Sequence, residues 1–168
     1  MNRETFKLGD ERVLGFGKGV VGTFRVDSNV HLVLRGPDGQ VKQEEWSHNT
    51  VPDAGVYAIM EQLLDAPATA VPSHMELGTG TPGATKLGAY IAGSRTALSS
   101  KTRSSAVVTM VATFAAGTGT GAITEAGIFN SASEDAGTMY CSDSFAVINK
   151  AAADSLTITW TLTGAGAA

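Results

Sequence analysis

The sequence predicts a mainly β protein: a β-sandwich or flattened barrel with one α-helix and an extended N-terminal arm. Residues 155–163 (SLTITWTLT) alternate between apolar and hydroxyl side chains without a break, which is the period of a strand with one buried face. Only 17% of the residues are charged, and the chain contains 20 glycines. This composition is typical of strands joined by tight turns. One segment, residues 53–65, has the period of an amphipathic helix.

A chain of 168 residues is long enough for one domain with a buried core. Residues 1–18 are polar and have no period, so we expect an extended arm there. A single β-rich domain should follow over residues 19–163, and residues 164–168 (GAGAA) should form a flexible tail.

The domain should begin with a strand at residues 19–26 and a second strand at residues 29–35. Gly36-Pro37-Asp38-Gly39 follows and predicts a tight turn, because proline presets φ and glycine accepts positive φ. Residues 40–47 should then return as the hairpin partner.

A helix is predicted at residues 53–65. Thr50 and Asp53 have the spacing of a capping box. Pro52 is tolerated at a helix start, and Pro67 should end the helix. Apolar residues at three- and four-residue spacing predict its buried face: Val56, Ile59, Met60, Leu63 and Leu64.

After the helix, the composition predicts a loop-rich stretch up to residue 93, with a short strand at residues 74–77. Further strands should lie at residues 97–116, where residues 107–114 are the clearest, and then at 123–130, 137–142, 143–149 and 155–163.

The charge distribution argues against direct binding of nucleic acid. The net charge is −4; residues 1–103 hold eleven basic and eleven acidic residues, and residues 104–168 hold one basic and five acidic residues. No stretch has the Lys/Arg density that a phosphate backbone requires. No apolar run is long enough to span a membrane, and the first residues lack the apolar core of a signal peptide. We therefore expect synthesis in a cytoplasm and no membrane partner.

One glycine-rich motif resembles a dinucleotide-binding fingerprint. Residues 78–83 (GTGTPG) match GxGxxG, but that fingerprint also needs a following helix and an acidic residue about 20 positions on. The next residues are interrupted by glycine, and the distant position offers Lys101 and Arg103. We expect a turn between strands and no cofactor.

Other reactive residues form no recognisable catalytic or metal-binding pattern. His31, His48 and His74 lie on separate elements without zinc-ligand spacing, and Cys141 is the only cysteine. No GxSxG elbow places a serine nucleophile. The sequence therefore predicts no catalytic, cofactor-binding or metal-binding residues, and we expect that the protein is not an enzyme.

Two groups of residues are candidates for contacts with other proteins. The arm carries apolar residues that could bind a partner: Phe6, Val13, Leu14 and Phe16. The hydroxyl face of residues 155–163 carries no charge to oppose association. This face makes Thr157, Thr159 and Thr161 the candidate subunit interface.

Three segments in order resemble small structural proteins of tailed bacteriophages, a group that covers head decoration, minor capsid and tail-associated proteins. The segments are residues 41–55 (VKQEEWSHNTVPDAG), residues 75–81 (MELGTGT), and residues 123–130 (ITEAGIFN), the last followed by 137–140 and 156–162. The resemblance covers about residues 20–163 and brings no catalytic residues.

The resemblance implies a virion structural protein made in the host cytoplasm. Our leading hypothesis is a capsid decoration, or cement, protein that binds the major capsid protein on the outer head surface and braces the shell. At a three-fold position of the shell it would form a homotrimer. The alternative is a tail, baseplate or fibre-associated protein whose partners are tail or baseplate proteins.

Overall fold

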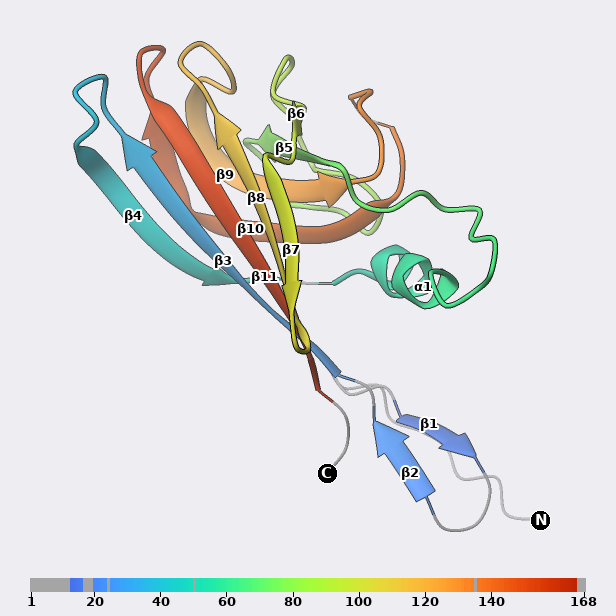
Figure 1. Cartoon of the computed structure of the whole chain (residues 1–168). Coiled ribbons are helices and arrows are strands. Elements are labelled where there is room, and N and C mark those ends of the chain that lie inside the picture. Colours follow the sequence, from blue (N-terminus) through green and yellow to red (C-terminus); the bar gives the residue numbers. More distant parts are fainter. Residues whose placement is uncertain (1–12, 17–19, 24, 50, 135, 166–168) are drawn as a thin grey trace.

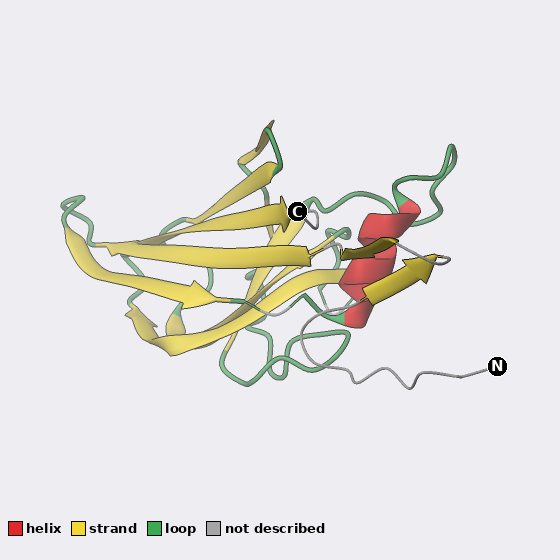
Figure 2. Ribbon diagram, turned by 90° about the horizontal axis from the view of Figure 1, so that it is seen from below, coloured by secondary structure: helices red, strands yellow, loops and turns green. Residues whose placement is uncertain are grey.

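The computed structural model describes residues 13–165, apart from residues 17–19, 24, 50 and 135. In this part of the chain, two antiparallel sheets pack face to face, and a single helix lies against one end of them (Figures 1 and 2). The sheets do not close into a barrel. The predicted mainly β fold with one helix is confirmed. Of the two forms expected from the sequence, β-sandwich and flattened barrel, the structure has the β-sandwich.

The larger sheet has five strands in the order β4-β3-β11-β8-β7. Strand β11 lies at its centre and pairs antiparallel with β3 on one side and β8 on the other. The strand predicted at residues 155–163 is confirmed, and sheet partners cover both of its edges. The strand bounds are β3 (Arg25–Arg35), β4 (Val41–His48), β7 (Ser100–Ser104), β8 (Val107–Phe114) and β11 (Ser155–Ala165).

The smaller sheet has four strands in the order β10-β9-β5-β6. One strand of this sheet, β10, corrects the prediction of two separate strands at residues 137–142 and 143–149. Its pairing with β9 continues through two irregularities, one of them between Ser144 and Ile148, so a single bent strand spans both segments. The strand bounds are β5 (His74–Gly78), β6 (Thr96–Ala97), β9 (Gly121–Phe129) and β10 (Met139–Lys150).

A separate hairpin precedes the sandwich. Strand β1 (Val13–Phe16) pairs antiparallel with β2 (Val20–Thr23). The single strand expected at residues 19–26 is therefore divided between β2 and β3, and the hairpin crosses the arm boundary expected at residue 18. At the other end, β11 continues to Ala165, inside the segment expected to be a tail.

The core lies between the two sheets, as the alternation in β11 predicts. Leu156, Ile158 and Trp160 are fully buried, and the Trp160 Nε1–H donates a hydrogen bond of 3.0 Å to Ser28 Oγ. This bond satisfies the one polar group that the indole brings into the core. Apolar side chains of both sheets complete it, among them Val30, Leu32, Met110 and Phe114 from the larger sheet and Leu77, Ile123, Ile128 and Ile148 from the smaller.

The turn between β3 and β4 forms as predicted. The Gly39 N–H donates a 2.9 Å hydrogen bond to the Gly36 carbonyl, and Gly39 has φ +79°. The Gln40 N–H also donates to Asp38 Oδ1 at 3.1 Å. Glycine is favoured at position 39 because residues with a Cβ rarely adopt this conformation.

The helix α1 (Asp53–Glu61) begins at the predicted residue but differs from the prediction in its end and its buried face. Its N-cap residue is Pro52, which makes no side-chain cap hydrogen bond. Thr50, the predicted cap residue, lies outside the described residues, so the capping box stays a prediction. The helix ends four residues before the predicted end at residue 65. There the Gln62 side chain donates to the Thr69 carbonyl at 2.8 Å, and the Glu61 carboxylate accepts the Ala68 N–H at 2.8 Å.

The buried face of α1 consists of small residues. Gly55 and Ala58 are buried, and a Cβ added to Gly55 would lie 2.0 Å from the Tyr140 carbonyl oxygen on β10. This close approach places Gly55 and Ala58 against β10, and three residues of the predicted apolar face remain exposed, one on α1 and two after its end. Ile59 is partly buried against the core, whereas Met60, Leu63 and Leu64 are exposed.

Candidate interaction surfaces

The outer face of the larger sheet carries the predicted subunit-interface residues Thr157, Thr159 and Thr161. All three are half-buried within the chain. They lie opposite Val33, His31 and Asn29 of β3 and opposite Thr113, Val111 and Thr109 of β8. The Thr157 and Thr113 hydroxyls are 3.2 Å apart and share a hydrogen bond. No outward-facing residue of β11 or β8 is charged, so the centre of this surface is uncharged and rich in hydroxyls.

A stacked aromatic pair lies beside this hydroxyl-rich centre. Trp46 of β4 is 67% exposed, and its ring stacks on His31 with centroids 3.9 Å apart and planes 11° apart. His31 Nε2 lies 2.7 Å from Glu44 Oε1. The stacking covers one face of the Trp46 ring, and the rest of this large apolar side chain remains exposed to solvent. We call the outward-facing residues of β4, β3, β11 and β8 the outer sheet face.

A second exposed apolar surface lies on α1 and the segment that follows it. Its members are exposed large apolar residues: Tyr57 and Met60 on α1, and Leu63, Leu64 and Val71 in the segment after it.

The arm residues predicted to bind a partner are only partly described. Phe6 lies outside the described residues, and Val13, Leu14 and Phe16 form the backbone of β1. Their role in attachment stays a prediction.

The GTGTPG segment is a loop that closes over the smaller sheet, and a buried carboxylate organises it. Glu125 of β9 is fully buried. Its Oε1 accepts the backbone N–H groups of Gly80 at 2.9 Å and Ala89 at 2.8 Å, and its Oε2 accepts the Gly88 N–H at 2.9 Å. The adjacent Thr124 hydroxyl donates to the Gly80 carbonyl at 3.0 Å. These loop amides are therefore bound to the protein's own carboxylate, and no helix follows the motif.

A buried ion pair fixes the same loop further along. Arg95 contacts Glu76 of β5 through two hydrogen bonds of 3.1 and 2.9 Å, and both side chains are 2% exposed. The Arg95 guanidinium also lies 3.8 Å from the centre of the Phe129 ring and donates to the Ser131 carbonyl. Because a buried charge is costly without partners, these contacts make Arg95 a fixed structural element.

His31, His48 and His74 lie on three different strands, β3, β4 and β5, and Cys141 lies on β10. Among the residues described, no group of three or more His, Cys, Asp and Glu side chains could hold a metal ion. Cys141 is fully buried, and burial raises its thiol pKa to about 12. It is a packed, unreactive thiol at neutral pH, because nucleophilic reactivity requires the thiolate.

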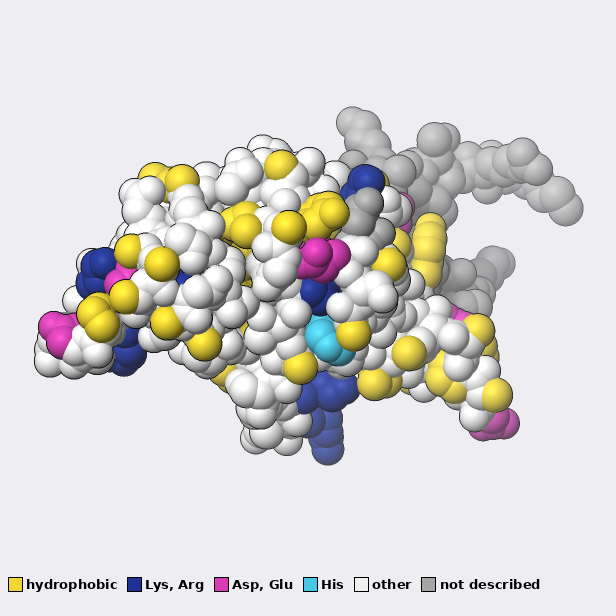
Figure 3. All heavy atoms as spheres, turned by 90° about the horizontal axis from the view of Figure 1, so that it is seen from above, with side chains coloured by type: hydrophobic (Ala, Val, Ile, Leu, Met, Phe, Trp, Pro, Cys, Tyr) yellow, Lys and Arg dark blue, Asp and Glu magenta, His cyan; other side chains and the backbone are white. Residues whose placement is uncertain are grey.

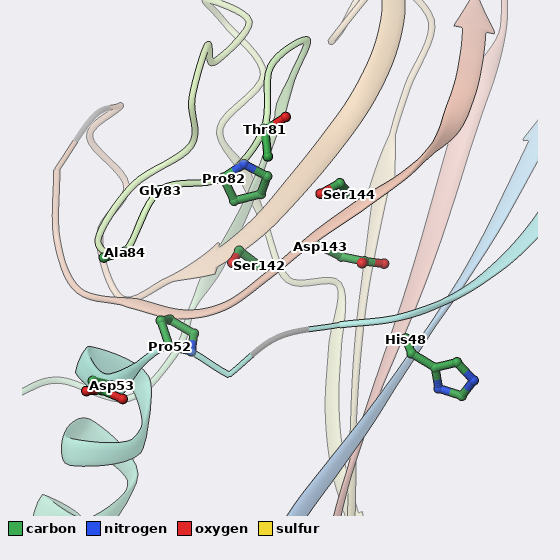
Figure 4. A pocket seen from close by; sticks show the side chains of 10 residues that line it. All are labelled: His48, Pro52, Asp53, Thr81, Pro82, Gly83, Ala84, Ser142, Asp143 and Ser144. Atoms are coloured by element: carbon green, nitrogen blue, oxygen red, sulfur yellow. The ribbon is translucent and has the colours of Figure 1, made fainter. Parts of the chain in front are cut away.

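One cleft of about 570 Å³ opens between the start of α1, the end of β4, β10 and the loop after β5 (Figure 4). Asp143 of β10 lines it and is 4% exposed. The sequence alone did not predict roles for Asp143, Glu125 or Glu76. The signal available for Glu125 and Glu76 was an acidic residue within an apolar strand. The lining residues are His48, Pro52, Asp53, Thr81, Pro82, Gly83, Ala84, Ser142, Asp143 and Ser144.

On the face seen in Figure 3, charged side chains stand in small separate groups among uncharged surface. None of the described helices is long and apolar enough to cross a membrane. In comparisons with known proteins, no family model, no curated protein and no solved structure matches this chain.

Proposed function

We propose that this protein is a structural component of a tailed-bacteriophage virion, and specifically a decoration protein on the outer surface of the head. It would bind the major capsid protein and associate with itself as a homotrimer. The resemblance of residues 41–55, 75–81 and 123–130 to phage structural proteins supports the virion assignment.

The outer sheet face is the observation that carries this proposal. Its centre lacks charge, and Trp46 lies exposed beside it. Protein–protein interfaces are depleted of charged residues at their core and enriched in aromatic residues. The central strand β11 is paired on both edges, so the residues of this face are held in fixed register. Such a surface suits a protein that works by repeated contacts in a lattice.

The buried polar residues also support a structural role for the protein. Glu125, Glu76 and Arg95 are buried and bind parts of their own chain, so they serve the fold. Among the described residues, the surface features available for binding include the outer sheet face, the apolar surface on α1 and the segment after it, and the cleft at Asp143.

Labelled antibodies against the protein, applied to purified particles and viewed by electron microscopy, test the proposal. We expect label distributed over the head. Label confined to the tail or baseplate would favour the tail-associated alternative over decoration. Particles without label, from a lysate in which the protein is abundant and not particle-bound, would contradict a virion role.

A further inference from the structure

The cleft at Asp143 contains a buried acceptor that the protein does not satisfy. Asp143 Oδ2 has no hydrogen-bond partner among the described residues. The residue is 96% buried, since only 4% of its surface is exposed. It extends from β10 toward the end of β4 that carries His48 (Figure 4). A carboxylate oxygen that has lost water without gaining a donor is unfavourable, and it marks a place where an additional donor would be stabilising.

The other groups around Asp143 compensate only part of this cost. Burial raises the Asp143 pKa, while hydrogen bonds from the Ser47 hydroxyl and the Ser144 N–H, and the nearby His48, act in the opposite direction. None of the described residues that line the cleft is a lysine or arginine, and Asp53 is a second carboxylate among them. The described lining therefore offers acceptors and negative charge, with His48 as its one basic side chain.

We propose that this cleft binds a primary ammonium group, which donates a hydrogen bond to Asp143 Oδ2. A guanidinium binds a carboxylate best through both oxygens, whereas an ammonium is a compact charge with three rotatable donors. Only one oxygen of Asp143 is available, so the geometry favours the ammonium. Thr81, Ser142 and Ser144 line the same cleft, so their backbone amides report on a ligand that enters it. This inference does not depend on the proposed virion function.

A lysine side chain of a partner protein and a free alkylamine share this chemistry. The binding test uses butylammonium chloride as the first probe and a short capped peptide with one lysine as the second. Binding is followed by NMR of the full chain, through the backbone amides of the cleft and the side-chain carboxyl carbon of Asp143. Tetramethylammonium chloride is the matched control, because it has the same charge but no N–H donor.

We expect butylammonium to cause saturable shifts at Thr81, Ser142 and Ser144 and to lower the Asp143 pKa. Tetramethylammonium at equal concentration should cause neither change. Tighter binding of the peptide would assign the site to a partner's lysine, and tighter binding of butylammonium would assign it to a small amine. No saturable shift with either probe, or equal effects of butylammonium and tetramethylammonium, would overturn the proposal.

Two variants sharpen the test. Asp143→Asn should weaken butylammonium binding by about tenfold or more, since a charge-assisted hydrogen bond is lost. Asp65→Asn removes an exposed carboxylate outside the cleft and should leave binding unchanged. Equal weakening by both variants would show a general charge effect and contradict a site at Asp143. If Asp143→Asn does not fold, the wild-type protein still decides the outcome: butylammonium should lower the Asp143 pKa, and tetramethylammonium should not.

Discussion

Glu125 Oε1 accepts a hydrogen bond of 2.9 Å from the backbone N–H of Gly80, a residue 45 positions earlier in the chain. Gly78 allows this contact, because a Cβ at that position would lie 2.4 Å from the same carboxylate oxygen. The loop after β5 is thus tied to β9 by a buried carboxylate and three backbone amides.

The change Glu125→Gln should lower the free energy of unfolding by about 2–4 kcal/mol. An amide keeps only one acceptor oxygen, so at least one buried N–H of the loop loses its partner. Urea unfolding measures the loss, and faster hydrogen exchange at Gly80, Gly88 and Ala89 locates it. Glu134→Gln is the control, because Glu134 accepts the Gly93 N–H on an exposed loop and should matter less. Equal destabilisation by both variants would contradict the role of Glu125.

The change Gly55→Ala should destabilise the protein by about 2–3 kcal/mol or more. The added methyl group would meet the Tyr140 carbonyl, which is backbone and cannot turn away. Gly83→Ala is the matched control, since its Cβ would meet only the Lys86 carbonyl at 3.4 Å. Thermal unfolding distinguishes the two. A stable Gly55→Ala protein would show that α1 does not pack on β10 through this residue.

Ile59 on α1 and Leu63 just after its end differ in exposure, so aspartate substitutions at the two positions should have different effects. Leu63 is 77% exposed, so Leu63→Asp should change the free energy of unfolding by less than about 0.5 kcal/mol. Ile59 packs against the core, and Ile59→Asp should cost several kcal/mol because it buries a charge. Chemical unfolding of both variants checks this. Strong destabilisation by Leu63→Asp would show that Leu63 is buried, as the apolar spacing of the sequence predicts.

Acid should weaken the contact between the β10–β11 turn and β4. Lys42 Nζ donates to Asp154 Oδ2 at 2.7 Å, and this bond is the largest cause of a lowered Asp154 pKa. A lowered carboxyl pKa stabilises the folded state above the pKa of the unfolded chain, and this stabilisation is lost as pH falls through the folded pKa. Urea midpoints between about pH 5 and pH 2 should therefore fall less steeply for Lys42→Met than for wild type. Parallel pH curves would contradict the coupling.

The strands could be predicted because they depend on local alternation. In β11, Leu156, Ile158 and Trp160 point inward and the threonines point outward, as the sequence indicates. The continuity of β10 could not be predicted. Asp143 and the irregularity after Ser144 interrupt the alternation of apolar residues, whereas the backbone pairing with β9 continues.

The helix and the candidate sites depend on contacts between distant segments. The apolar spacing of α1 is real, but the approach of Gly55 to Tyr140 decides which face is buried. The roles of Glu125 and Asp143 likewise arise from loops and strands that meet only in the folded chain. For that reason the sequence could predict the threonine face of β11 but not the cleft.

The change Thr159→Lys should weaken the proposed homotrimer without unfolding the chain. Thr159 lies at the centre of the outer sheet face, between His31 and Val111, and a charge there would have to be desolvated in an interface. Analytical ultracentrifugation measures the effect, with circular dichroism as the check on folding. Thr85→Lys adds the same charge on an exposed loop and should leave the trimer intact. A wild-type monomer would contradict the trimer, and a trimer unaffected by Thr159→Lys would exclude this face.

Cryo-electron microscopy of purified particles tests the virion role most directly. We predict density for the β-sandwich on the outside of the head, with Trp46 and Thr159 turned into contacts between subunits or with the shell. Density for the protein only on the tail, or on the head with the outer sheet face open to solvent, would contradict this account.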